Sequence, residues 1–488
     1  MNSKDYDIAV IGAGVSGCSI ARELSRYALR IALVEAGADV AAGSSKANSA
    51  IVHAGFDCVP GTLMAKLNVE GTRKMEGLCS ELGVPFRKNG SFVLAFNDDE
   101  KDRLKKLKEQ GEANGVQGLE IWTAEQVRKA EPEVNQAVIA ALWAPTAGIV
   151  CPYELTLALA ENAVVNGVIF FREWKVSNIQ KNENGFCLKN STGEQLCARW
   201  VINAAGLYAD EISAMVATPG FVIKPRRGEY VLYDRKFGHL SQRTLFQLPS
   251  VMGKGVLVSP TVDGNLFVGP NAEDIASKTD TAVTAEGRSK VIGAGLRSLP
   301  GLKSALPITA FSGLRAVLPD RHDFLLDWAM PGFFNVAGIC SPGLSAAPAM
   351  GSFVAEALRK AGLGLQPNLS FTPKRAAPVH FRMLGDTERA QLIKQDSSYG
   401  RIVCRCESVT EAEIVHAVTG PLPATTLDGV KLRTRVGMGR CQGGFCTPRV
   451  MEILSREQGR DMECITKSGG DSWLVCRKLK AQEGDCDE

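Results

Sequence analysis

Four cysteines near the end of the chain have the type and spacing to hold an inorganic centre. Cys404 and Cys406 form a C-x-C pair, and Cys441 and Cys446 form a C-x4-C pair. Glycines at 439, 443 and 444 let backbone N–H groups approach the sulfur atoms, as iron–sulfur clusters favour. Structural zinc uses pairs spaced from C-x2-C to C-x4-C, so the C-x-C pair is unusual for zinc. The pattern favours an iron–sulfur cluster over zinc or no metal.

A glycine-rich motif near the start of the chain predicts a dinucleotide site. An apolar strand over residues 6–11 leads into a G-x-G-x-x-G turn, a helix follows over 18–27, and a second strand over 31–34 ends at an acidic residue. The glycines allow the tight turn, the close approach of a pyrophosphate and tight helix packing, while the acid binds ribose hydroxyls. The predicted binding residues are Gly12, Gly14, Val15, Ser16, Gly17 and Glu35.

A second glycine-rich segment, Gly293 to Ser298, resembles this motif but has serine at the third glycine position. The residues before it, Glu286 to Val291, have a charged, helical pattern, whereas the dinucleotide motif requires a preceding strand. We therefore interpret the segment as a helix end and expect one Rossmann-type site.

Composition limits the class of protein. The chain has 488 residues, of which 45% are hydrophobic and 22% charged, and a net charge of +3. These values predict a globular protein of two or three domains and no nucleic-acid partner. Neither a signal peptide nor an apolar run long enough to span a membrane is evident, which predicts a cytoplasmic protein, with contact at the inner membrane face left open.

The ten other cysteines are scattered along the chain and show no ligand spacing. We expect most of them to be reduced and buried, as small hydrophobic residues. Cys340 lies in a glycine-rich loop, and packing is again the simpler interpretation. These cysteines are at positions 18, 58, 79, 151, 187, 197, 340, 464, 476 and 486.

Residue patterns divide the chain into segments. Helices are predicted over 62–82 and 98–114, strands near 168–171, 185–188 and 200–203, and a β-meander over 221–270. A strand, a glycine-rich turn and a helix follow over 332–365. A polar, proline-containing linker covers 366–398.

The predicted cluster domain spans 399–460, and a tail follows over 461–488. Thr410 and Glu413 predict a capping box that starts a helix through His416. A second helix is expected after Cys446, near Pro448.

Several motifs together resemble the D-amino-acid-oxidase-like flavoproteins, over about residues 5–360. They are the first glycine motif with Glu35, the loop Ser44–Gly55, Val201–Gly206, and the late turn Gly338–Ser345. The resemblance implies that the dinucleotide is FAD. It adds further cofactor-binding residues: Ser45, Asn48, Ser49, Ala205, Gly206, Gly338, Gly343, Leu344 and Ser345.

The implied fold is an α/β Rossmann-type FAD-binding domain with an inserted mixed or antiparallel β-sheet for the substrate, followed by a small helical iron–sulfur domain. The oxidoreductase would cover residues 1–365. Within it, the FAD-binding segments would be about 1–80, 145–215 and 310–365, and the substrate-binding segments about 81–144 and 216–309.

The segment Leu427–Cys446 is similar to bacterioferritin-associated-ferredoxin-like [2Fe–2S] domains, and in particular to the version fused to the large subunits of anaerobic glycerol-3-phosphate dehydrogenases. This resemblance implies ligation of a [2Fe–2S] cluster by Cys404, Cys406, Cys441 and Cys446.

The catalytic half also resembles L-2-hydroxyglutarate dehydrogenases, through Asn48–Phe56 and Arg227–Tyr230. The substrate therefore stays open between glycerol 3-phosphate, which would yield glycerone phosphate, and a 2-hydroxy acid, with amino-acid or opine oxidation behind them. A third alternative is an electron-transfer or redox-sensing flavoprotein without a substrate.

Oxidation of a secondary alcohol needs a base, an anion-binding group and a position over the flavin. His53, before Ala54-Gly55, is the predicted base, although a hydrogen-bonded core histidine is the plainer interpretation. Arg315 and Lys254 are the predicted anion-binding residues, against an ordinary salt bridge and a solvated hairpin lysine. Arg226 and Arg227 are weaker candidates, and His322 is expected in a polar loop.

The two cofactors together imply an electron path from flavin to cluster to a partner. The expected partner is an electron-accepting protein subunit, such as one that reduces quinone. Oligomeric state and peripheral membrane contact stay open, and a cluster with only a structural role is the alternative.

Overall fold

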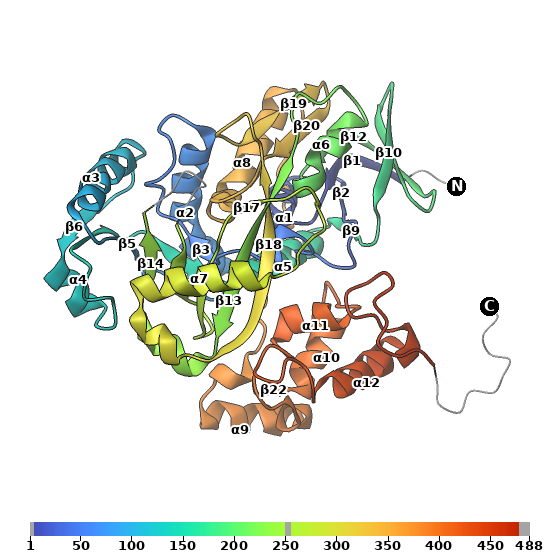
Figure 1. The fold of residues 1–488 in the computed structure, drawn as a ribbon. Coiled ribbons are helices and arrows are strands. Elements are labelled where there is room, and N and C mark those ends of the chain that lie inside the picture. The colour runs from blue at the N-terminus through green and yellow to red at the C-terminus, as the bar shows by residue number, and fades with distance from the viewer. Residues whose placement is uncertain (1–3, 249–254, 478–488) are drawn as a thin grey trace. The chain divides into compact units, whose positions relative to one another are not determined.

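The computed structural model describes residues 4–248 and 255–477 and divides the chain into two compact units. The first unit comprises residues 1–35 and 40–376, and the second comprises 36–39 and 377–488. Figure 1 shows the elements of both. None of the helices in the described part is long and apolar enough to cross a membrane.

An eight-stranded sheet forms the base of the first unit, in the order β10-β11-β12-β1-β2-β9, with β20 beside β12 and β19 beside β20. Strands β1, β2, β9, β12 and β20 run parallel to their neighbours in this group, so their C-terminal ends meet at one edge. The strands are β1 (Lys4–Ile11), β2 (Ile31–Val34), β9 (Ile169–Phe171), β10 (Val176–Asn182), β11 (Gly185–Asn190), β12 (Gln195–Asn203), β19 (Leu325–Met330) and β20 (Phe333–Ala337).

Helices pack against one another beside this sheet. Helix α1 contacts α5 and α8, and α8 also contacts α2. Gly71 of α2 explains how closely α2 and α8 approach, because a Cβ there would lie 2.0 Å from the Ser345 carbonyl oxygen. The helices are α1 (Val15–Leu24), α2 (Leu63–Leu82), α5 (Pro152–Val165), α6 (Ala209–Ala214) and α8 (Gly343–Lys360).

The second large sheet has nine strands, in the order β17-β13-β16-β15-β14-β5-β7-β6, with β18 beside β13. All its pairings are antiparallel except β5 with β14. The strands are β5 (Ser91–Ala95), β6 (Glu120–Thr123), β7 (Ala140–Ala144), β13 (Lys224–Tyr233), β14 (Thr244–Gln247), β15 (Leu257–Pro260), β16 (Leu266–Gly269), β17 (Glu273–Asp274) and β18 (Pro307–Val317).

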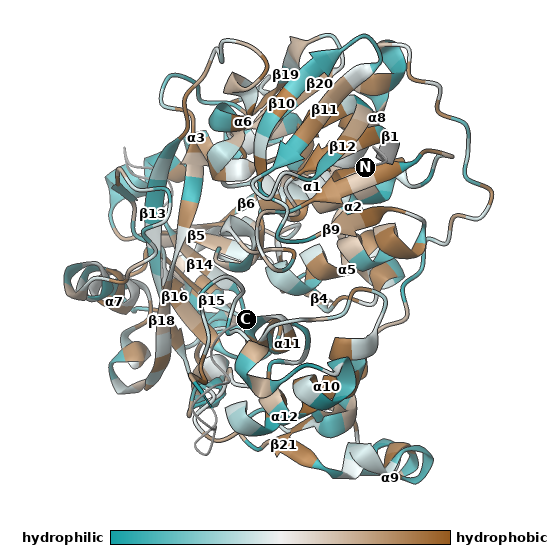
Figure 2. Ribbon diagram, turned by 90° about the vertical axis from the view of Figure 1, so that its right-hand side faces the viewer, coloured by the Kyte–Doolittle hydropathy of each residue, from teal (hydrophilic) through white to brown (hydrophobic). Residues whose placement is uncertain are grey.

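Both faces of this sheet are buried. Val231 and Tyr233 of β13 pack in a core with α7 (Ala285–Ser298), while Tyr230, the residue before Val231, belongs to a core on the other face. Figure 2 shows hydrophobic residues along β15 and β16. Helices α3 (Asp98–Ala113) and α4 (Ala124–Ala130) and a small sheet of β3 (Ile51–Val52), β8 (Gly148–Val150) and β4 (Phe86–Arg87) complete the unit.

The observed architecture confirms the predicted fold class, but the meander predicted over 221–270 is only partly right. Strands β14, β15 and β16 form a meander, whereas β13 pairs with β16 and β18. The position of β13 is set by its long-range pairing with β18. This pairing comprises ten register pairs, from Lys224–Val317 to Tyr233–Pro307. The segment Gly293–Ser298 lies in α7, as expected.

The prediction for the scattered cysteines needs correction. Cys187 and Cys197 form a disulfide, because pairing of β11 with β12 places them directly opposite each other, with a Cα–Cα distance of 4.2 Å. Cys464 and Cys476 are exposed rather than buried. Cys18, Cys58, Cys79 and Cys151 are buried and form no disulfide, as expected, and Cys486 lies outside the described residues.

The second unit is mainly helical. Its elements are α9 (Asp386–Gln395), β21 (Ile402–Cys404), β22 (Val409–Thr410), α10 (Glu411–Thr419), α11 (Leu427–Thr434) and α12 (Thr447–Gln458). The predicted capping box is present: the Thr410 hydroxyl accepts the Glu413 N–H, and the Glu413 carboxylate accepts the Thr410 N–H. Ile414, Val430 and Ile453 pack in the core of this unit.

Candidate functional site

The predicted glycine motif forms a tight junction between β1, α1 and the segment after β12. Gly12 has φ +99°, and a Cβ there would lie 2.5 Å from the Ala204 carbonyl oxygen. A Cβ on Gly17 would lie 1.9 Å from the Gly12 carbonyl oxygen. Only glycine allows this approach. Gly14 is the N-cap of α1 and provides no side-chain cap, so the N–H groups of Ser16 and Gly17 in the first turn of the helix suit an anionic pyrophosphate.

Glu35 and the loop after it lie against the same junction. The Glu35 carboxylate accepts the Ala13 N–H at 2.8 Å, and the Ser45 hydroxyl accepts the Val15 N–H at 2.9 Å. The Asn48 amide donates to the Ser44 and Ser45 carbonyl groups, at 3.3 and 3.0 Å. Asn48 therefore shapes the loop that carries Ser45 and Ser49.

The other predicted cofactor residues follow the ends of two parallel strands. Ala205 and Gly206 come after β12, and Gly338 to Ser345 come after β20 and begin α8. Because β1, β12 and β20 are neighbours, these turns converge at the edge of the sheet where the glycine motif lies. Val15, Ser16 and Leu344 lie in the first turns of α1 and α8. This arrangement fits an extended dinucleotide.

His53 is buried where the loop meets α8. Its backbone N–H donates to the Ser345 hydroxyl at 2.8 Å, and its carbonyl accepts from the Thr72 hydroxyl at 2.8 Å. Its Nε2 lies 3.3 Å from the Ser341 hydroxyl, and its ring centroid is 5.7 Å from that of Phe246 in β14. The imidazole thus lies between the late turn and the nine-stranded sheet.

Arg315 reaches the same region from β18. Its guanidinium donates to the Asn271 carbonyl at 3.3 Å and hydrogen-bonds the Tyr230 side chain. Tyr230 also hydrogen-bonds the Ser49 side chain, and burial raises the pKa of its hydroxyl, against the opposing effect of the nearby Arg315 charge. Tyr230 therefore links a predicted cofactor residue with a predicted substrate residue.

Sequence reasoning gave Tyr230 no role, and Ser341 appeared only as part of a motif. The signal for Tyr230 was the alternation along β13, which places it on the face shared by Phe311, its register partner. The Tyr230 and Phe311 rings are stacked, with their centroids 4.8 Å apart. That pairing spans about eighty residues of sequence, so the alternation along β13 could not identify Phe311 as the partner of Tyr230.

Gly228 makes room for Arg315. A Cβ on Gly228 would lie 2.9 Å from Arg315 Nη2 and 2.8 Å from Pro270 Cβ. Asn271, which accepts from Arg315, is itself fixed by the buried Glu229: its side chain accepts the Glu229 N–H and donates to the Glu229 carboxylate. Glu229 also accepts from the Thr284 N–H at the start of α7. The sheet therefore holds the guanidinium in place.

Two of the other predicted cations are engaged by carboxylates, although Arg226 lies directly opposite Arg315 in the β13–β18 register. Arg226 pairs with Asp274, and Arg227 pairs with Glu273 and Asp280. Hydrogen bonds from these arginines to Asp274 and Glu273 raise the pKa values of Arg226 and Arg227. Lys254 lies outside the described residues. His322 is exposed in a turn, as expected.

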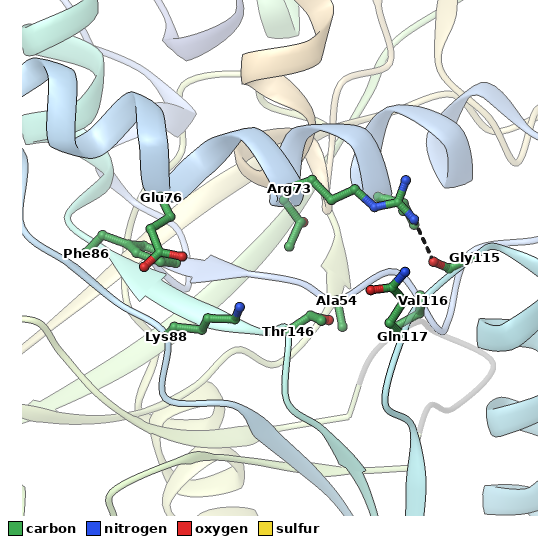
Figure 3. Close-up of a pocket in the computed structure, with 11 residues that line it drawn as sticks. Ala54, Arg73, Glu76, Phe86, Lys88, Gly115, Val116, Gln117 and Thr146 are labelled. Carbon is green, nitrogen blue, oxygen red and sulfur yellow. Dashed lines mark hydrogen bonds between the residues drawn. The ribbon is translucent and has the colours of Figure 1, made fainter.

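A cavity of about 200 Å³ adjoins the His53 loop on the side of α2. Figure 3 shows Arg73 and Glu76 reaching it from α2 and Lys88 and Thr146 from the opposite side. Arg73 donates to the Gly115 carbonyl at 2.9 Å, and the buried Thr146 hydroxyl has no partner among the described residues. No sequence motif predicted this cavity. Ala54, one of the residues that line it, directly follows His53 in the sequence.

In the second unit the four predicted cysteines form two close pairs. Cys406 and Cys441 have their sulfur atoms 3.7 Å apart, and the Cys446 thiol hydrogen-bonds Cys404. Within the described residues, no three His, Cys, Asp or Glu side chains are grouped as ligands of a single metal ion. A [2Fe–2S] cluster takes two thiolates on each of two irons, which two pairs can supply.

Backbone N–H groups around the sulfur atoms also fit an anionic cluster. The hydrogen bond from Cys446, followed by N–H groups of Gly437 and Glu407, lowers the pKa of Cys404 to about 6 although burial opposes this. Burial likewise opposes ionisation of Cys441, but N–H groups of Gly443, Phe445 and Gly444 lower its pKa.

Gly439 and an ion pair bring the two cysteine loops together. A Cβ on Gly439 would lie 2.3 Å from Cys406 Cβ, so only glycine allows the loops to approach this closely. The buried Glu407 carboxylate binds Arg435 at 3.0 Å. These contacts join residues 404–408 to residues 435–441.

Comparison with known proteins defines the class. Residues 7–357 match the family described as FAD dependent oxidoreductase, and residues 402–456 match the BFD-like [2Fe-2S] binding domain. The chain belongs to the FAD-dependent oxidoreductases and carries a [2Fe–2S] domain. The predicted cofactors, FAD and a [2Fe–2S] cluster, are thereby confirmed, and the glycine junction and the paired cysteines fit them.

Three individual proteins show which members of the family this chain resembles. The chain is 47% identical to the glycerol 3-phosphate dehydrogenase of Caloramator mitchellensis, over 98% of this chain and 99% of that protein. The FAD-bound L-alpha-glycerophosphate oxidase of Mycoplasma pneumoniae has 32% identity and a TM-score of 0.72, covering 77% of this chain and all of that one. L-2-Hydroxyglutarate dehydrogenase of Mus musculus is 32% identical over 54% of this chain and 60% of that protein.

Proposed function

We propose that this chain is a glycerol-3-phosphate dehydrogenase that yields glycerone phosphate and passes the electrons through its [2Fe–2S] cluster to a partner. The observation that carries this proposal is the 47% identity with a glycerol 3-phosphate dehydrogenase over nearly both full lengths. The similarity includes the cluster domain as well as the catalytic half. The L-2-hydroxyglutarate dehydrogenase similarity covers only about half of the chain.

Bound FAD supplies the acceptor for the hydride from the alcohol carbon. The residues of the chain bind the substrate, orient it and take its proton. Arg315 suits the phosphate, because a guanidinium offers a planar fork of donors to an oxyanion. Its bonds to Tyr230 and the Asn271 carbonyl restrict its position before substrate binds. Lys254 remains a second proposed phosphate ligand.

His53 is the proposed base. Its Nε2 would accept the proton of the substrate's secondary hydroxyl in place of the contact that this nitrogen now makes with the Ser341 hydroxyl, 3.3 Å away. Hydrogen bonds at both the N–H and the carbonyl of His53 fix the peptide that carries it. Phe246, Tyr230 and Phe311 provide an aromatic wall that excludes water.

The electrons are proposed to leave through the second unit. One substrate molecule releases two electrons, whereas a [2Fe–2S] cluster carries one at a time, so two successive transfers to an acceptor are needed. The paired cysteines and the N–H groups around them support cluster binding. The partner is proposed to be an electron-accepting protein.

Anaerobic stopped-flow absorbance tests the substrate. The reconstituted protein would be mixed separately with glycerol 3-phosphate and L-2-hydroxyglutarate, and the flavin absorbance followed. We expect rapid bleaching with glycerol 3-phosphate alone. Bleaching by neither compound would indicate another substrate or an electron carrier without its own substrate.

A 2-hydroxy acid is the second candidate. It is favoured by one observation: Arg226 and Arg227 are both paired with carboxylates, whereas Arg315 bonds Tyr230, and one guanidinium suffices for a carboxylate. Bleaching with L-2-hydroxyglutarate but not with glycerol 3-phosphate would establish this alternative, and Arg315 would then hold the carboxylate.

A further inference from the structure

The two cysteine pairs of the second unit differ in exposure. Cys404 and Cys446 are buried, whereas Cys406 is exposed and Cys441 is partly exposed. The sulfur atoms of the exposed pair are 3.7 Å apart, so they can share one iron. One end of the cluster site is therefore covered by the core of the unit, and the other faces outward.

The side chains around the outward-facing pair are unusual for a surface loop. Phe445 lies directly before Cys446 and is 89% exposed. Its backbone N–H, not its ring, serves Cys441. Cluster binding therefore does not explain the aromatic side chain, and exposed aromatic residues beside a functional group are typical of protein interfaces.

The charge around the pair has one sign. In the two loops, residues 404–408 and 437–446, the exposed charged residues are Arg405 and Arg440. The one acidic residue there, Glu407, is buried and paired with Arg435. Arg405, Cys406, Arg440, Cys441 and Phe445 together form what we call the exit patch, which is cationic with an apolar point.

We propose that the exit patch docks a one-electron acceptor protein whose redox centre is surrounded by acidic side chains, so that electrons leave at the iron held by Cys406 and Cys441. This rests on the proposed function, which it deepens by naming the surface and the chemistry of the partner. In each transfer the acceptor gains the one electron that the reduced cluster loses. Two transfers discharge the electrons of one alcohol oxidation.

A membrane fits this patch less well than a protein. Stable attachment to a lipid surface requires an amphipathic helix or a broad polybasic region. The exit patch has one aromatic ring and two arginines on short loops. A complementary acidic rim on a protein needs no larger area, because charge pairs at the rim steer encounter.

Binding to flavodoxin, an acidic one-electron carrier, tests the proposal. The full, cluster-loaded chain would be measured against immobilised flavodoxin by biolayer interferometry at low and high salt. The variants are Arg405→Glu, Arg440→Glu and Phe445→Ser. We expect each charge reversal to weaken binding roughly tenfold at low salt and to flatten the salt dependence. Phe445→Ser should weaken binding at both salt concentrations.

Matched controls come from α9 and the segment before it in the same unit. Lys394→Glu reverses an exposed charge on α9, and Met383→Ser removes an apolar side chain that is 67% exposed. Neither should alter flavodoxin binding. Iron content and the visible spectrum of each variant would confirm that the cluster is present.

Electron transfer is measured separately with dithionite-reduced protein, so that failure with glycerol 3-phosphate does not affect the result. The proposal is supported if the patch variants reduce flavodoxin more slowly. Their reduction of cytochrome c, a basic carrier, should be unchanged or faster. Equal binding by patch and control variants would overturn it. The proposal would also be overturned if the patch variants no longer sedimented with phosphatidylglycerol vesicles but bound flavodoxin unchanged. That result would indicate that the exit patch binds a lipid surface.

Discussion

His53 is held at three points, by Ser341 and Ser345 of the late turn and by Thr72 of α2. We expect His53→Asn to reduce the rate of flavin reduction by substrate by roughly 10²–10⁴-fold, as loss of a general base does. The measurement is anaerobic stopped-flow absorbance at saturating glycerol 3-phosphate. His322→Asn, in the exposed turn, is the control and should retain the rate. An undiminished rate in His53→Asn would remove His53 from the mechanism.

Gly228 tests the placement of Arg315. In Gly228→Ala the new methyl group would lie 2.9 Å from Arg315 Nη2, so the guanidinium must move away from its present position. We expect a rise in KM for glycerol 3-phosphate larger than the fall in kcat, because anion binding is the role proposed for Arg315. The flavin spectrum should be unchanged.

Gly293→Ala is the matched control for this substitution. Its Cβ would meet nothing within 4 Å on the exposed side of α7, so steady-state kinetics should stay at the wild-type values. Equal KM values for both variants would show that Gly228 does not position Arg315.

At the scale of elements, Gly71 and Gly77 provide the same substitution on two faces of one helix. A Cβ on Gly71 would lie 2.0 Å from the Ser345 carbonyl, whereas a Cβ on Gly77 would meet nothing within 4 Å. We expect Gly71→Ala to lower the free energy of unfolding by about 1–3 kcal/mol through overpacking. Gly77→Ala should raise it by up to about 1 kcal/mol, because alanine favours a helix.

Denaturant unfolding of the two variants measures this difference. Ser345 also accepts the His53 N–H, so Gly71→Ala should slow flavin reduction as well as lower stability. If Gly71→Ala proved as stable as Gly77→Ala, the close α2–α8 approach would be wrong.

Elements with local signals could be predicted from sequence. The glycine motif lies between a strand and a helix only a few residues away, and the capping box of Thr410 and Glu413 spans one helical turn. The four cysteines stand out by spacing alone. These features are determined by neighbours in sequence, so a single sequence reveals them.

Features set by strand pairing could not be predicted. Tyr230 meets Ser49 and Arg315 only because β13 pairs with β18 and the loop after η1 (Ser44–Lys46) lies against it. The Cys187–Cys197 disulfide depends on the register of β11 and β12 in the same way. A shift of one residue in either register would turn these side chains to the opposite face.

At the scale of the whole molecule, the two units have separate cores, so loss of the cluster should spare the flavin chemistry. We expect Cys406→Ser, which changes an exposed thiol, to lose the cluster while retaining FAD. Flavin bleaching by glycerol 3-phosphate should persist, and electron transfer to flavodoxin should fall sharply.

Iron analysis, the flavin spectrum and the two rates check this prediction. Ser468→Ala, an exposed change in the same unit away from the cysteine loops, is the control. Loss of FAD together with iron would show that the units do not fold separately.

The strand order also determines when, during synthesis, the segments of the dinucleotide site become available. β1 leaves the ribosome well before its neighbour β12, which ends at residue 203, and the turn after β20 is complete only at Ser345. At about 5–20 residues per second, the nascent chain waits roughly 20–70 seconds before all walls of the dinucleotide site exist. Until β12 emerges, the edge of β1 opposite β2 lacks its partner and is open to aggregation. FAD can therefore be captured only after Ser345 has emerged, and the cysteine loops follow it, so flavin insertion can precede delivery of iron and sulfide.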